Sequence, residues 1–147
     1  TIGNGMAQLS AKPGTSVMMI IEFVRRIEEP DLVLLAASIE IHHSSSVLMT
    51  AQVMLAPSDI REIGEGLNEV CASQRRRFFF TNIDYDFHID AESLEWQPDD
   101  DISVGFWHGE PYDLMRGFKF VVRAQDLSGF ALALVAEAAR SAEAAEG

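Results

Sequence analysis

The 147-residue sequence contains a single cysteine, Cys71, and only 11 Lys and Arg against 23 Asp and Glu. One cysteine excludes an intrachain disulfide, and its place among the apolar positions of a predicted helix indicates a small core residue. The formal net charge of -12 repels phosphate backbones and anionic lipids. We therefore expect no direct binding to nucleic acid or to membranes, and the charge favours a basic partner.

Long apolar runs are also missing. No stretch approaches the roughly 18 to 20 apolar residues that a membrane-spanning helix needs. The first residues lack the charged-then-apolar order of a secretory signal, so we expect a cytoplasmic protein. The chain opens with Thr1, and Met6 is a candidate for the natural start.

The remaining composition suits one ordinary domain. Apolar residues make up 48% of the chain and charged residues 23%, close to globular averages, so a core can form without metals or disulfides. We expect residues 1–147 to form a single domain. Residues 1–16, rich in glycine and small polar residues, are expected to be a loose arm, and residues 141–147 a frayed tail.

The first half of the chain predicts three strands and a helix. Apolar runs bounded by turn residues predict antiparallel strands over residues 17–27, 32–43 and 47–55. Pro57 then stands where a first helical residue belongs, and apolar residues follow at three- and four-residue spacing. We predict a helix from Pro57 to Ala72.

The second half predicts further strands and a last helix. Residues Ile83 to Asp90 alternate without interruption, which predicts a strand with one apolar face and one carboxylate face. Phe78 begins another extended segment, and residues 102–109 and 118–123 predict the two arms of a hairpin. An apolar stripe from Leu127 to Ala138 predicts a C-terminal helix.

These elements predict an α+β fold in the order βββαββββα, with one of the strands left open. No alternating βαβ pattern requires a parallel sheet. We expect a mostly antiparallel sheet of about six to seven strands, with both helices packed on one face.

An acidic segment between Phe78 and Met115 contains ten Asp and Glu and no Lys or Arg. Such a row of negative charge steers a basic protein partner, and an aromatic neighbour supplies anchor area. The residues that we expect to bind the partner are Asp84, Asp86, Asp90, Glu92, Asp99, Asp100, Asp101, Trp107 and Glu110. The alternative is a solvated sheet face, with Lys119 and Arg123 as cross-strand partners.

A metal site is a second hypothesis, because carboxylates and imidazole suit several divalent ions. Its candidate ligands are Asp86, His88, Asp90 and His108. Residues two apart on one strand lie about 6.6 to 7 Å apart, so ligands from other strands, such as His42 or His43, are required. A metal-dependent enzyme or a small-ligand-binding domain is thus the alternative, and a homodimer or larger homo-oligomer is a third.

Motifs of catalysis and cofactor binding are otherwise missing. The sequence has no Gly-x-Ser-x-Gly elbow. Its Gly64-x-Gly66 pair lies inside a predicted helix, without the lysine of a phosphate loop. We expect a non-catalytic protein without a cofactor.

Three segments carry a resemblance: VMLAPSDIREIGEGL at the first helix, IDYDFHID, and FKFVVRAQDLSGFALAL at the end. Strands, a Pro-started helix, more strands and a last helix follow in this order. In this layout the chain resembles the small bacterial immunity proteins of the WapI type and similar domains. The resemblance implies that the protein neutralises a toxin by tight non-covalent binding, with no catalytic residues.

Overall fold

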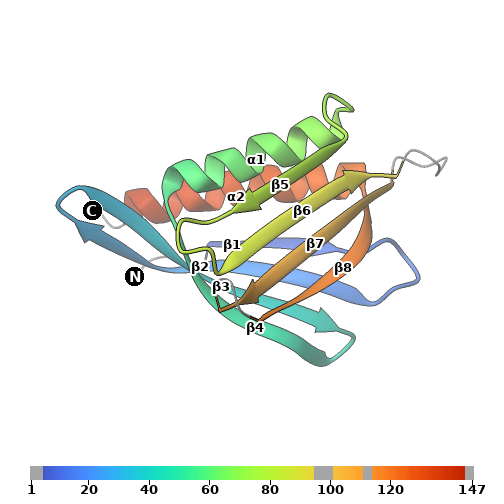
Figure 1. Cartoon of the computed structure of the whole chain (residues 1–147), viewed down its shortest axis with the longest axis horizontal. Helices are drawn as coiled ribbons and strands as arrows, with labels where there is room; N and C mark the ends of the chain where they lie inside the picture. The colour runs from blue at the N-terminus through green and yellow to red at the C-terminus, as the bar shows by residue number, and fades with distance from the viewer. Residues whose placement is uncertain (1–4, 95–100, 111–113, 145–147) are drawn as a thin grey trace.

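The computed structural model describes residues 5–94, 101–110 and 114–144 (Figure 1). In these ranges the chain forms eight strands and two helices. They are β1 (Gly5–Ser10), β2 (Val17–Glu29), β3 (Leu32–His43), β4 (Ser46–Leu55), α1 (Pro57–Cys71), β5 (Arg77–Thr81), β6 (Phe87–Ser93), β7 (Asp101–Gly109), β8 (Met115–Arg123) and α2 (Ala124–Ala144). The order is ββββαββββα, so each half of the chain is four strands followed by a helix.

The strands form two antiparallel sheets, not one. The first sheet has the order β1-β2-β3-β4 and the second has the order β5-β6-β7-β8. The α+β class and the antiparallel pairing are confirmed, whereas the single sheet of six to seven strands is wrong. Helix α1 separates β4 from β5, and each group of four strands pairs only with its neighbours in sequence.

The N-terminal segment that we expected to be a loose arm contains β1. Ala7 and Leu9 alternate inward from this strand and are buried, and Ala7 pairs with Ile21 of β2. The strand is short and begins at Gly5, so its two inward residues gave too weak a pattern to detect. At the other end, α2 continues to Ala144, and residues 145–147 lie outside the described chain.

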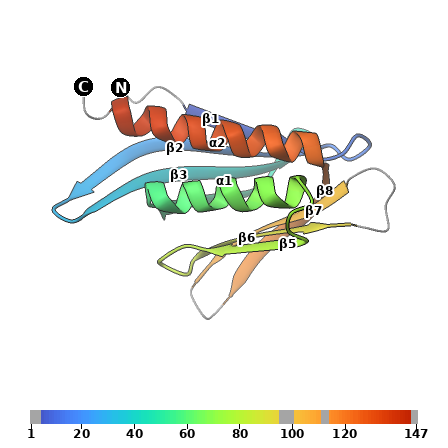
Figure 2. The ribbon, with the colours of Figure 1, turned by 90° about the horizontal axis from the view of Figure 1, so that it is seen from above.

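The two helices lie side by side and run in opposite directions (Figure 2). Helix α1 begins at Pro57, as predicted, and the Asp59 carboxylate accepts the Ala56 N–H at 2.9 Å. Helix α2 packs mainly against β1 and β2, while α1 packs against β5 and β6. The helices thus contact both sheets, and the expectation that they share one face of one sheet is wrong. Neither of them, over the described residues, has the length and apolar character to cross a membrane.

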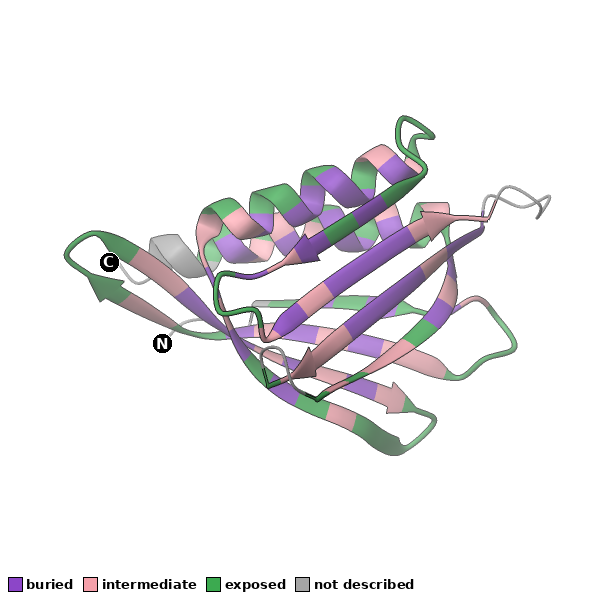
Figure 3. Ribbon diagram, viewed as in Figure 1, coloured by how far each residue is buried: buried purple, intermediate pink, exposed green. Residues whose placement is uncertain are grey.

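One buried cluster joins both sheets and both helices (Figure 3). Its largest fully buried side chains include Phe23 from the first sheet, Phe87 and Phe106 from the second, and Phe130 from α2. Because these rings come from both sheets and from α2, neither sheet has a separate core.

The predicted strand from Ile83 to Asp90 is wrong in its first half. Strand β5 ends at Thr81 and β6 begins at Phe87, with a turn between them. Within the turn, Ile83 is 66% exposed, and Tyr85 is 50% exposed with a φ of 56°. The alternation therefore crosses a turn, and only Phe87 and Ile89 of its apolar residues face the core.

Gly66 of α1 lies where the helix meets β5. A Cβ at this position would overlap the buried ring of Phe78, whereas a Cβ at Gly129 of α2 meets nothing within 4 Å. We expect Gly66→Ala to lower the free energy of unfolding by about 2 kcal/mol through overpacking. We expect Gly129→Ala to raise it by about 0.5 to 1 kcal/mol through helix propensity. Urea unfolding measures both effects. A higher free energy of unfolding in both variants would contradict the close packing at Gly66.

Candidate binding cleft

An open cleft of about 930 Å³ lies between β4 of the first sheet and one end of the second sheet. The turn between β5 and β6 contributes Asp84 and Asp86, and β7 contributes His108 with Glu110 directly after it. These four residues are candidates from the sequence, and the fold brings the β5–β6 turn together with the end of β7. Leu48 to Thr50 of β4 form the opposite wall.

Asn82 holds the turn that carries the two aspartates. Its side chain is buried, and its Oδ1 accepts the N–H groups of Asp86 and Phe87, both at 3.1 Å. Its Nδ2 donates to Asp86 Oδ1 at 2.6 Å and to the Met54 carbonyl of β4 at 3.5 Å. One amide thus folds the turn and attaches it to the first sheet.

Asn82 is not among the residues predicted from the sequence, because it lies just before the predicted strand from Ile83 to Asp90. The available signal was an asparagine followed by Ile83-Asp84, since asparagine side chains commonly bond to the backbone a few residues ahead and so open turns. That signal is weak beside an uninterrupted eight-residue alternation, and the alternation decided the prediction.

The hairpin between β7 and β8 meets the same turn. The Gly109 N–H donates to the Asp86 carbonyl at 3.1 Å, and the Glu110 N–H donates to the Leu114 carbonyl, also at 3.1 Å. A Cβ at Gly109 would overlap the backbone of Leu114, so this close approach requires glycine. It brings Glu110 to the rim of the cleft.

Among the described residues that line the cleft are three carboxylates and one permanent cation, Arg116. Asp84 and Glu110 are exposed, and Asp86 is half-buried. Within the described ranges, no ion pair joins Arg116 to any of these carboxylates. The site is therefore negative, and two of its carboxylates face solvent. Phe118 and Leu114 add apolar surface.

Asp90 and Asp101, expected to belong to an unneutralised acidic row, are buried and paired with cations. Asp90 lies 3.3 Å from Lys119 Nζ and 3.5 Å from Arg77 Nε. Asp101 Oδ2 lies 2.6 Å from Lys12 Nζ. The interpretation of these two as exposed charge is wrong, because neighbouring strands and the β1–β2 loop supply the cations that the segment itself lacks.

The remaining partner candidates lie away from the cleft. Glu92 of β6 and Trp107 of β7 are half-buried, and their register places them on the side of the second sheet that Asp90 also faces. Asp99 and Asp100 lie outside the described residues. The structure thus gathers Asp84, Asp86 and Glu110, and separates the others from them.

The four candidate metal ligands do not converge. His88 Nδ1 lies 2.7 Å from Thr81 Oγ1, and its ring stacks on Phe79 at 5.5 Å. His108 pairs in register with buried Phe87, so it faces the first sheet, opposite to His88. In the part of the chain that the structure describes, no three His, Cys, Asp or Glu are arranged to hold a metal ion.

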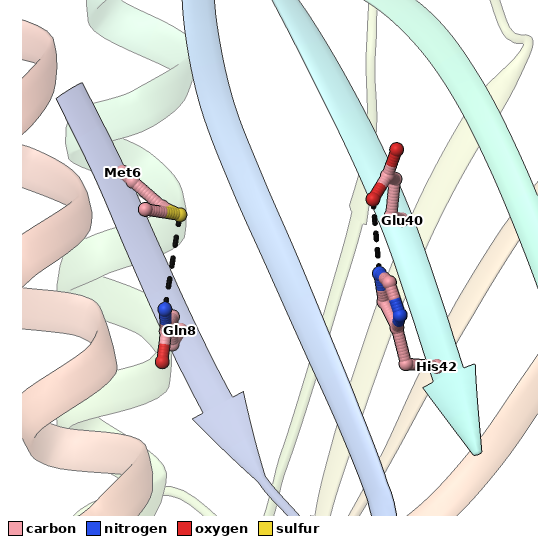
Figure 4. A network of polar contacts seen from close by, with 4 residues as sticks. All are labelled: Met6, Gln8, Glu40 and His42. Atoms are coloured by element: carbon pink, nitrogen blue, oxygen red, sulfur yellow. Dashed lines mark hydrogen bonds and ion pairs between the residues drawn. The ribbon is translucent and has the colours of Figure 1, made fainter. Parts of the chain in front are cut away.

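The histidines of β3 lie elsewhere again. His42 Nε2 is 2.9 Å from Glu40 Oε1, on the same strand, as Figure 4 shows beside the contact between Gln8 and Met6 of β1. His43 is exposed at the end of β3. Neither histidine lines the cleft that contains His108.

Cys71 borders a second hollow of about 560 Å³, where the end of α1 meets the start of α2. Burial raises the pKa of its thiol to about 11, against a smaller opposing effect of a backbone hydrogen bond. Because the thiolate is the reactive form, Cys71 is a poor nucleophile at neutral pH.

No family model matches the sequence, and no curated protein matches it. Among solved structures, the chain is similar to one titled "Crystal structures of trypanosoma bruciei MRP1/MRP2", with a TM-score of 0.44 and 9% sequence identity. The match covers 99% of this chain and 86% of that chain. A likeness of this size supports no inference about function.

Proposed function

We propose that this chain is a non-catalytic cytoplasmic binding protein that receives a basic segment of a partner protein in the cleft. The role fits an immunity-type inhibitor that neutralises a basic toxin. The observation that carries the proposal is the gathering of Asp84, Asp86 and Glu110 around one open cleft. Carboxylates placed in this way attract lysine and arginine and raise the rate of association.

Apolar surface around the carboxylates supports a protein partner. Leu48 is 44% exposed and Leu114 is 65% exposed, and both line the cleft. Ile83 and Tyr85, also exposed, flank Asp84 in the same turn. Protein interfaces combine apolar anchors with a polar rim, and the aliphatic stems of lysine and arginine pack on apolar surface while their charges reach carboxylates.

The test uses a peptide of about eight residues that alternates lysine with valine and threonine, a length within the usual range of strands. We expect the lysine peptide to bind and its Kd to rise with salt, while a glutamate version of the same peptide does not bind. Removal of two cleft charges by Asp84→Asn with Glu110→Gln should weaken binding about tenfold. Isothermal titration calorimetry measures each Kd.

The matched control is Asp31→Asn with Glu29→Gln, which removes an exposed glutamate at the end of β2 and an exposed aspartate in the turn that follows it. It changes the net charge by the same amount and should leave the Kd unchanged. Equal weakening by both double variants would mean that total charge, and not the cleft, determines binding. Binding of the glutamate peptide would also refute the proposal.

A further inference from the structure

Strand β4 is an edge strand of the first sheet, and it lacks the charges, the proline and the short length that protect most edges. One bulge interrupts its pairing with β3, at Leu48, between Val47, which pairs with His42, and Met49, which pairs with Ile41. Its ten residues, SVLMTAQVML, include no charged residue and no proline. Exposed sheet edges pair readily with other chains, so natural edges are normally short, charged, interrupted by proline or covered. A long, uncharged edge indicates a surface that another strand covers.

The other three edges are protected. Strand β1 has six residues and packs against α2, and β5 has five residues and begins at Arg77. Strand β8 contains Arg116, Lys119 and Arg123, and its Val121 carbonyl accepts the Lys12 N–H at 2.8 Å. Of the four sheet edges in the described ranges, β4 is thus the long one without a charged residue.

Among the described residues, a side chain from outside the first sheet bonds to the backbone of β4 at its C-terminal end, where the Met54 carbonyl accepts from Asn82. Its N-terminal half is open, with Val47 53% exposed and Leu48 44% exposed. This half borders the acidic cleft, since Leu48, Met49 and Thr50 form one of its walls. A strand laid along the open half would therefore run beside Asp84, Asp86 and Glu110.

We propose that the N-terminal half of β4 pairs with an extended basic segment of the partner, which adds a strand to the first sheet. This inference rests on the proposed function and names how the cleft holds its partner. Main-chain hydrogen bonds to β4 would supply affinity. Side chains of a strand alternate, so every second side chain of the segment would point toward the cleft carboxylates.

Charge favours a basic segment over a second copy of this chain. Two copies paired through β4 would bring their acidic clefts together, and each copy has a net charge of -12. Like charges across an interface oppose association. A basic strand meets complementary charge at the same place.

The experiment uses the lysine peptide and two analogues, methylated on its odd or its even backbone nitrogens. A strand offers N–H groups on both edges, and only one edge faces β4. We expect one analogue to bind about tenfold more weakly than the parent and the other to bind like the parent. Amide hydrogen exchange by NMR should show that the parent peptide slows, about tenfold or more, those amides between Val47 and Ala51 that do not bond to β3.

The outcomes separate this inference from the proposed function. If both analogues bind like the parent and no β4 amide is slowed, strand pairing is refuted, while weakening by the Asp84 and Glu110 variant would still support the cleft. If that variant has no effect, the proposed function fails. A second copy covers the edge if the β4 amides that do not bond to β3 are protected without peptide and light scattering gives twice the chain mass. That result would overturn the inference.

Discussion

Lys12→Met is expected to lower the free energy of unfolding by about 3 kcal/mol. Lys12 Nζ lies 2.6 Å from Asp101 Oδ2, and Asp101 is 3% exposed. The other carboxylate oxygen of Asp101 is buried and has no hydrogen-bond partner among the described residues. Loss of the ammonium group would leave a buried charge without a cation. Lys12 itself is one third exposed, so we place the cost at the lower end of the range for buried pairs.

Arg140→Met is the matched control for this prediction. It removes a cation from the pair of Arg140 with Glu137 on the surface of α2, and it should cost about 0.5 kcal/mol or less. Adding Asp101→Asn to Lys12→Met should recover part of the lost stability, because the buried charge disappears. Urea unfolding of all four proteins measures the effects. If Lys12→Met lowers the free energy of unfolding by no more than Arg140→Met does, the Asp101 carboxylate does not depend on Lys12 for its stabilisation.

Asn82→Ala is expected to destabilise the fold by about 3 kcal/mol, since it leaves the N–H groups of Asp86 and buried Phe87 without their acceptor. The contact from the turn to Met54 of β4 also disappears. Asp86 would no longer be held at the cleft, so affinity for the lysine peptide should fall as well. Thermal unfolding and peptide titration measure the two effects separately.

Asn68→Ala serves as the control for Asn82. Asn68 is exposed on α1 and accepts one hydrogen bond, from Ser128 Oγ at 3.3 Å. Surface substitutions of this kind usually change stability by no more than about 0.5 kcal/mol. If Asn82→Ala is tolerated equally well, the turn does not depend on the buried amide.

Individual elements with strong local patterns could be predicted from the sequence. Strand β3 has the predicted bounds, Leu32–His43, and α1 starts at Pro57. Strands β7 and β8 form the predicted hairpin. In each case the alternation of buried residues, or the helical spacing after a proline, is a property of neighbouring residues. The α+β class and antiparallel pairing follow from the order of such elements.

The candidate site could be predicted only in part. Asp84, Asp86 and Glu110 were chosen for their charge, and all three line the cleft. Leu48 to Thr50 were not chosen, because the sequence of a partly apolar, uncharged strand does not reveal whether the strand lies at the edge of a sheet. Whether a strand is central or at an edge depends on pairing between segments, which periodicity does not report.

The sequence by itself determined the acidity of the chain, the absence of a disulfide within it, and most of its strands and helices, because these depend on composition and on neighbouring residues. The tertiary structure alone decided that the strands divide into two sheets. It also decided that Asp101 is neutralised by Lys12, 89 residues away in sequence, and that β4 is an edge strand beside three carboxylates. These features depend on contacts between residues far apart in sequence. Such ion pairs and hydrogen bonds form only once the chain has folded.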